Sequence, residues 1–178
     1  MCQTEIKHEE SVVEYQQRET VTMRALGLWQ PWASLVAHGI KTIETRSWGP
    51  PASLIGQRIA IHATKKKVNL KSPFVDEWMI ALRDHGHDSV SLPYGSIVCT
   101  AVLSDAWQVD GRRSQADGSV LAIGSDGKQC EIDRWGDFSV GRWLWFLSDV
   151  ELYSDPLPRI GRQRLFKVTV PMPIGGDQ

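Results

Sequence analysis

The chain contains few cysteines and no long apolar run. Cys2, Cys99 and Cys130 are odd in number and far apart in the sequence, which fits neither a disulfide framework nor a zinc site. We therefore expect reduced, structural thiols. The five histidines and three cysteines show no metal-ligand spacing, so no metal site is predicted. No phosphate-cradling glycine motif or nucleotide-cofactor fingerprint is present, so no cofactor is predicted either.

The absence of a segment long and apolar enough to span a bilayer predicts no membrane association. The chain also begins without the basic and then apolar residues of a secretion signal. These two observations lead us to expect a cytoplasmic protein.

Charge is unevenly distributed along the chain, although the net charge is only -1. Residues 1–23 carry a net charge of -3, and residues 24–71 carry +7, with Glu44 as their one acid. Residues 72–156 carry -8, and residues 157–178 return to +3. If the two basic segments meet in space, they form a cationic face that suits a nucleic acid.

The 178 residues, of which 42% are hydrophobic, fit a single domain with a substantial core. Residues 1–22 are polar and acidic and predict a flexible N-terminal tail. We place the folded domain at residues 23–172 and a short C-terminal tail at residues 173–178.

Apolar runs between glycine and proline breaks predict several short strands, at residues 23–28, 40–46, 58–63, 96–103, 120–123, 143–147 and 165–170. A short helix is predicted at residues 32–38, with Pro31 in its first turn and Gly39 as its left-handed end. A second helix is predicted at residues 72–85, and the rest of residues 107–137 read as loops. This pattern favours a mixed α/β (α+β) fold: a small β-barrel with short helices packed at the rim.

The most informative stretch is a charged pattern, G-x-K-x-x-E-x-R, formed by Gly39, Lys41, Glu44 and Arg46. On a regular strand Glu44 and Arg46 share one face. Lys41 follows a turn, so the three charged side chains can converge. The cluster can bind phosphate or a base edge, or Glu44 can accept a proton from Lys41 so that the neutral amine attacks a carbonyl. A structural ion pair between Glu44 and Arg46 is the alternative.

In its wider context this pattern resembles the ASCH domain family of the PUA-like superfamily. The residues that carry the resemblance are Leu28-x-Gln30-Pro31-Trp32-Ala33-Ser34, Gly39-Ile40-Lys41 and Glu44-x-Arg46-Ser47-Trp48. It covers roughly residues 24–170 and is closest to the Gln-Pro-Trp-containing members, which are similar to the ASCH domain of a transcriptional coactivator. The resemblance implies a PUA-like barrel with a cleft for nucleic-acid components.

Members of the family include nucleic-acid-binding domains, ribonucleases and amidohydrolases that deacetylate N4-acetylcytidine with a Lys, a Thr and a Glu. Lys41 matches the lysine of those amidohydrolases, whereas Glu44 stands where they have the threonine. No counterpart of their glutamate can be assigned in this sequence.

We therefore predict a nucleic-acid-binding module that recognises single-stranded or modified RNA, with DNA as the other candidate, in a cationic cleft. A hydrolase of nucleosides or RNA that uses Lys41 and Glu44 is the alternative, and a protein-interaction domain of a transcription or translation complex is a third. The expected ligand-binding residues are aromatic, polar or basic and lie in or near the basic segments: Gln30, Trp32, Ser34, Lys41, Glu44, Arg46, Trp48, His62, Thr64, Lys65, Lys66, Arg162 and Arg164. Of the two flanking tryptophans, Trp48 is expected to be the exposed one, because it precedes Gly49-Pro50-Pro51.

Overall fold

The computed structural model of the chain describes residues 19–69, 71, 75–87 and 91–171. The predicted C-terminal tail and all but residues 19–22 of the predicted N-terminal tail lie outside this part. The elements, in chain order, are β1 Thr20–Leu28, α2 Trp32–Ala37, β2 Ile43–Arg46, the 3₁₀ turn Ala52–Leu54, β3 Arg58–Ala63, α3 Val75–Arg83, β4 Ser96–Ser114, β5 Val120–Gly124, β6 Gln129–Glu131, β7 Trp143–Pro158 and β8 Leu165–Pro171.

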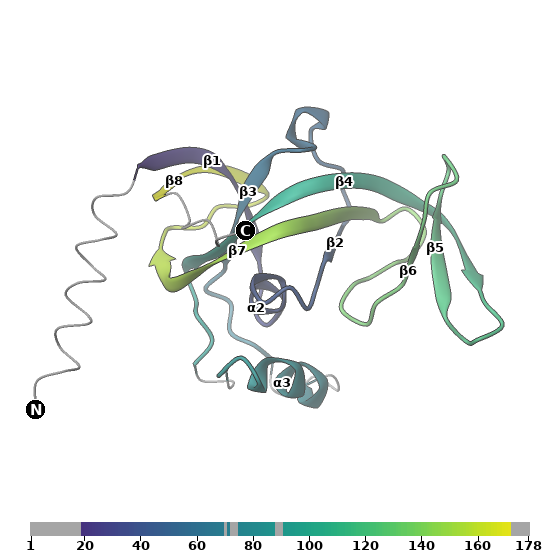
Figure 1. Ribbon diagram of the computed structural model, residues 1–178, viewed down its shortest axis with the longest axis horizontal. Helices are drawn as coiled ribbons and strands as arrows, with labels where there is room; N and C mark the ends of the chain where they lie inside the picture. Colours follow the sequence, from purple (N-terminus) through teal and green to yellow (C-terminus); the bar gives the residue numbers. More distant parts are fainter. Residues whose placement is uncertain (1–18, 70, 72–74, 88–90, 172–178) are drawn as a thin grey trace, which may run out of the picture.

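One mixed sheet of eight strands dominates the molecule, as expected for a mixed α/β fold with few helices (Figure 1). Six strands follow the order β2-β7-β4-β3-β1-β8, and β5 and β6 extend the far end of β4 as a ribbon. β1 and β3 run parallel, and the other paired strands are antiparallel. Among the described residues, no pairing joins β2 to β8, so a closed barrel stays a prediction.

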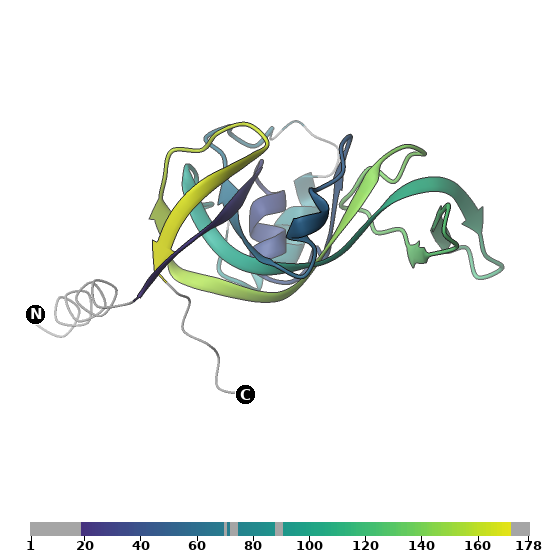
Figure 2. The same cartoon turned by 90° about the horizontal axis from the view of Figure 1, so that it is seen from above.

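β4 and β7 are far longer than the strands predicted from the apolar runs at residues 96–103 and 143–147. The expected loop over residues 107–114 is wrong, because β4 continues to Ser114 and pairs there with β5. Trp107 and Val109 are buried, whereas the alternate residues of this half of the strand are polar and solvated. A strand with one solvent-exposed face contains many of the polar residue types that are also typical of loops, which explains why a loop was predicted here. Figure 2 shows this ribbon reaching away from the helices.

The two helices lie on one side of the sheet, with α2 between the strands and α3 (Figure 1). Five of the six residues of α2 are buried. Gly39 follows this helix at φ +70°, the left-handed conformation predicted for its end. Trp78 and Leu82 of α3 pack against Leu35 of α2 in a separate apolar cluster. α2 is thus packed between the sheet and α3.

The structure shows the state of the cysteines and the arrangement of potential metal ligands in the described residues. Cys99 is buried and Cys130 is half-buried, and both are free thiols as predicted, whereas Cys2 lies outside the described residues. In the part of the chain that the structure describes, no group of three or more His, Cys, Asp or Glu side chains is arranged to hold a metal ion. None of the described helices is long and apolar enough to cross a membrane.

Three histidines meet where α2 and α3 end. The His38 and His85 rings stack with centroids 4.4 Å apart, and the Nε2 atoms of His38 and His87 are 2.9 Å apart. The pKa of His38 is lowered to about 4, mainly by burial and in addition by the neighbouring His85 and His87.

This cluster predicts a loss of stability in acid. Between about pH 6.5 and pH 4 the unfolded chain protonates His38 while the folded chain does not. The free energy of unfolding should therefore fall as the pH is lowered through this window. Chemical denaturation of the wild type and of His38→Gln should show a shallower fall in the variant. Identical pH profiles for the two proteins would exclude His38 as the cause.

Candidate nucleic-acid interface

The charged cluster converges as the sequence predicted. Lys41 precedes β2, and its Nζ lies 3.4 Å from Glu44 Oε2. Arg46 Nε lies 3.0 Å from Glu44 Oε1, on the other side of the same carboxylate. Lys41 Nζ also donates a hydrogen bond to the backbone carbonyl of Ile43. One carboxylate is therefore held between two cations at the start of an edge strand.

The three side chains differ in how far solvent reaches them. Lys41 is 1% exposed, Glu44 11% and Arg46 25%. Arg46 Nη2 donates to the Gly27 carbonyl at 2.6 Å, which ties β2 to the end of β1. Lys41 lies deepest, with Glu44 above it. The cluster is thus both a structural ion-pair network and, through Glu44 and Arg46, part of an accessible surface.

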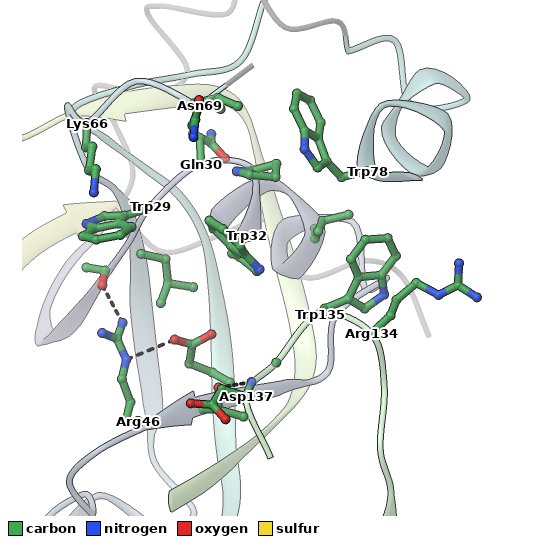
Figure 3. A pocket seen from close by; sticks show the side chains of 18 of the residues that line it. Trp29, Gln30, Trp32, Arg46, Lys66, Asn69, Trp78, Arg134, Trp135 and Asp137 are labelled. Atoms are coloured by element: carbon green, nitrogen blue, oxygen red, sulfur yellow. Dashed lines mark hydrogen bonds and ion pairs between the residues drawn. The ribbon is translucent and has the colours of Figure 1, made fainter. Parts of the chain in front are cut away.

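A pocket of about 710 Å³ opens above this cluster (Figure 3). Its walls come from the β1–α2 turn, α2, β2, the segment after β3, α3 and the loop before β7. The lining residues are Gly27, Leu28, Trp29, Gln30, Pro31, Trp32, Leu35, Glu44, Thr45, Arg46, Lys66, Lys67, Val68, Asn69, Trp78, Arg134, Trp135, Gly136, Asp137 and Arg142. Five of the predicted ligand residues are among them: Gln30, Trp32, Glu44, Arg46 and Lys66.

Four tryptophans line the pocket, and two of them are well exposed. Trp29 is 53% exposed and Trp32 is 38% exposed, which is unusual for the largest apolar side chain. Lys66 Nζ lies 3.1 Å from the centre of the Trp29 ring, a cation–π contact. Trp78 belongs to the apolar cluster between α2 and α3, Trp135 packs against that cluster, and both stand on the opposite side of the pocket from Trp29 (Figure 3).

The expectation that Trp48, rather than Trp32, is the exposed ring is wrong. Trp48 is half-buried, packs against the main core and contacts Trp145 edge-on with ring centroids 4.9 Å apart. Trp32 occupies the first position of α2, where its five followers are buried and it alone faces outward. The outward-facing Trp32 lines the pocket.

Gln30 and Ser34 bind each other and position the aromatic turn. The Gln30 amide donates to Ser34 Oγ at 2.9 Å and to the Pro93 carbonyl at 2.8 Å, and its Oε1 accepts the Ser34 amide N–H at 3.1 Å. Both residues are buried. Their hydrogen bonds hold the turn that carries Trp29 and Trp32, so we regard them as positioning residues for the pocket.

Most of the residues that line this pocket lie in the part of the chain that matches a known sequence family. The family model of the ASCH domain matches residues 26–119, more than half of the chain. The chain belongs to the ASCH domain family. The PUA-like superfamily is consistent with this membership. A comparison with curated proteins found no match.

Several other predicted ligand residues of this ASCH domain lie away from the pocket. His62 is buried, and its Nε2 donates to the Arg159 carbonyl at 3.0 Å. Thr64 is half-buried, and the Lys65 side chain packs beside Gly95. These three residues lie in β3 or just after it, whereas the part of this segment that lines the pocket comes later, from Lys66 to Asn69.

The two basic segments of the ASCH domain lie side by side, as the charge pattern suggested. β8 pairs with β1, with Lys167 opposite Arg24. Arg162 and Arg164 are exposed in the segment that precedes β8, and the Arg164 guanidinium lies 5.7 Å from the Trp48 ring. Neither arginine lines the pocket, but the Arg162 backbone passes close to Gly27 at the pocket wall.

One wall of the pocket was not predicted: the loop at residues 133–142. The Asp137 amide N–H donates to Thr45 Oγ1 at 3.0 Å, which docks the loop on β2. Arg142 Nε lies 3.1 Å from Asp137 Oδ2. Hydrogen bonds from Ser139 lower the pKa of Asp137, so this carboxylate is charged at neutral pH. The loop therefore brings both a charge pair and Trp135 to the pocket.

Trp29 and Lys67 were also missed, although both lie within the motif region. Trp29 directly precedes Gln30-Pro31-Trp32, and Lys67 completes a run of three lysines, so adjacency to predicted residues was the available signal. No comparable signal marks residues 133–142, because their contact with Thr45 joins positions about 90 residues apart.

Proposed function

We propose that this ASCH domain binds nucleic acid, with single-stranded or modified RNA as the preferred ligand, and that the pocket receives one unstacked base. The observation that carries the proposal is the composition of the pocket: exposed Trp29 and Trp32 together with five cations and two carboxylates. Proteins that hold single strands combine aromatic rings, on which bases stack, with cations along the phosphate backbone. The volume is in the range of small-ligand pockets.

The surroundings of the pocket also suit a phosphate backbone. Lys66 and Lys67 are exposed at the rim, and the exposed Arg162 and Arg164 lie on the neighbouring segment before β8. A strand whose base enters the pocket would pass these cations with its phosphates. We assign the function to a domain over residues 23–172, and the preference for RNA over DNA rests on the PUA-like relationship.

The geometry favours binding over amide hydrolysis at Lys41. A nucleophilic amine must reach its substrate, but Lys41 is 1% exposed, lies behind Glu44 and is absent from the pocket wall. Incubation with N4-acetylcytidine and with labelled RNA tests the hydrolase alternative directly. Turnover that is lost in Lys41→Met would favour the enzyme over the binding module.

The direct test of binding is a titration with short single-stranded RNA and DNA oligonucleotides at 50 and 200 mM salt. Phosphate contacts make affinity fall steeply as salt rises, because bound counterions are released on association. We expect micromolar or tighter binding at low salt, with RNA bound more tightly than DNA. Binding no tighter than that of an acidic control protein at low salt would remove the proposal.

Replacing Lys66 or Lys67 by alanine should weaken binding to all sequences alike. Each variant should also lower the slope of log affinity against log salt by roughly 0.7, the value for one phosphate contact with a single strand. Lys128→Ala is the matched control, because Lys128 is an exposed lysine of the ribbon that pairs with Asp105, outside the pocket. If neither rim lysine changes the slope, these lysines do not contact the backbone.

A further inference from the structure

We infer that the pocket selects guanine among the four bases. The inference rests on the proposed function and names the base that the pocket would receive. It is carried by the hydrogen-bonding character of the pocket floor, where Glu44 and Arg46 lie side by side.

The floor presents a fixed pair of acceptors. A carboxylate paired with two cations only accepts hydrogen bonds, and each of its oxygens has more than one lone pair. Glu44 Oε1 is held by Arg46 at 3.0 Å and Oε2 by Lys41 at 3.4 Å. Because Glu44 lines the pocket while Lys41 does not, the cations fix the carboxylate from the side and from below and leave acceptor positions toward the pocket.

Two neighbouring polar side chains, Gln30 and Thr45, make hydrogen bonds within the protein. Both N–H groups of the Gln30 amide donate to protein oxygens, and Thr45 Oγ1 accepts from Asp137. Arg46 Nε lies 3.0 Å from Glu44 Oε1, and Arg46 Nη2 donates to the Gly27 carbonyl. The floor therefore offers the two carboxylate oxygens of Glu44 as hydrogen-bond acceptors.

Guanine has the complementary edge. Its N1–H and 2-amino group donate side by side, so these two donors would face the two oxygens of Glu44. Adenine and cytosine place an amino group beside a ring nitrogen that only accepts, and uracil places one N–H between two carbonyls. Each of these three bases would set a lone pair against the carboxylate, which a partly buried site penalises strongly.

The aromatic walls hold such a base in place without selecting it. Stacking on Trp32 is available to every base, because each has a π-face. Selection therefore depends on the floor alone. The stacking rings and the rim lysines contribute affinity, and Glu44 determines which base is bound.

A nucleotide series on the wild-type protein tests this assignment without any substitution. Quenching of tryptophan fluorescence would be measured with the 5′-monophosphates of guanosine, inosine, adenosine, cytidine and uridine. We expect guanosine monophosphate to bind roughly 5- to 150-fold more tightly than the adenosine, cytidine and uridine forms. Inosine monophosphate lacks the 2-amino group and should fall between them.

The outcomes separate the two claims. If single-stranded RNA binds with strong salt dependence but guanosine monophosphate binds no better than the adenosine and cytidine forms, the guanine assignment is wrong and the proposed function stands. If neither RNA nor any nucleotide binds, both claims fail.

A variant pair examines the role of Glu44 itself. Glu44→Gln keeps the shape but replaces one acceptor by a donor, so the preference for guanosine over adenosine monophosphate should drop at least about fivefold. Asp105→Asn removes a carboxylate of the ribbon, outside the pocket, and should leave the preference unchanged. An unchanged preference in folded Glu44→Gln would overturn the assignment, and if that variant does not fold, the wild-type nucleotide series decides.

Discussion

Replacing Glu44 by alanine should lower the free energy of unfolding by roughly 3–5 kcal/mol, the cost of leaving a buried charge without its partner. The charge most at risk is the Lys41 ammonium, which is 1% exposed and would keep its hydrogen bond to the Ile43 carbonyl. Arg46, on the other side of the carboxylate, is 25% exposed and would keep its hydrogen bond to the Gly27 carbonyl. Urea denaturation monitored by circular dichroism gives the measurement.

Two controls show whether the loss comes from the unpaired charge. Glu44→Gln keeps an oxygen for Lys41 and should cost clearly less than Glu44→Ala. Lys41→Met removes the buried charge while nearly conserving volume, so it too should cost less. A loss in Glu44→Ala below about 1 kcal/mol would show that the pair contributes little to stability.

Replacing Trp32 by alanine should weaken binding of single-stranded RNA by about 1–3 kcal/mol, roughly 5- to 150-fold in affinity, because a base loses its stacking partner. The melting temperature should change little, since Trp32 is 38% exposed and projects from the first turn of α2. Fluorescence anisotropy with a labelled RNA measures the affinity, and thermal denaturation checks the fold.

Ile80→Ala is the matched control for Trp32→Ala. Ile80 is an exposed apolar residue of α3 that does not line the pocket, so its removal should leave the affinity unchanged. Equal affinities for wild type and Trp32→Ala would place the base elsewhere, and equal losses in both variants would indicate a general surface effect.

Local rules predicted the parts of the fold that depend on neighbouring residues. β3 has the predicted bounds, α2 lies within the predicted helix, and Gly39 ends it in the left-handed conformation. Convergence of Lys41 and Glu44 was also predicted, because Lys41 directly follows the turn at Gly39 and is not bound by the alternation of a regular strand. Each of these features is encoded within a few residues, so the pattern was sufficient.

Features that depend on distant partners were not predictable in the same way. The length of β4 depends on its pairing with β5 and β7, and on an apolar cluster in which Trp107 and Val109 pack with Phe138. The burial of Lys41 depends on the packing of α2 and the sheet around it, whereas the sequence indicated a surface cation. The pocket wall from the loop before β7 depends on the bond between Asp137 and Thr45. In each case a contact far along the chain decides the outcome.

The central claim is that a single-stranded nucleic acid enters the pocket and contacts its tryptophans. It is tested most directly by titrating ¹⁵N-labelled protein with a short single-stranded RNA and following the indole N–H signals by NMR. The signals of Trp29, Trp32 and Trp135, which line the pocket, should shift together, while those of Trp107 in the ribbon and Trp145 in the core stay in place. Shifts confined to tryptophans outside the pocket, or none at saturating RNA, would contradict the claim.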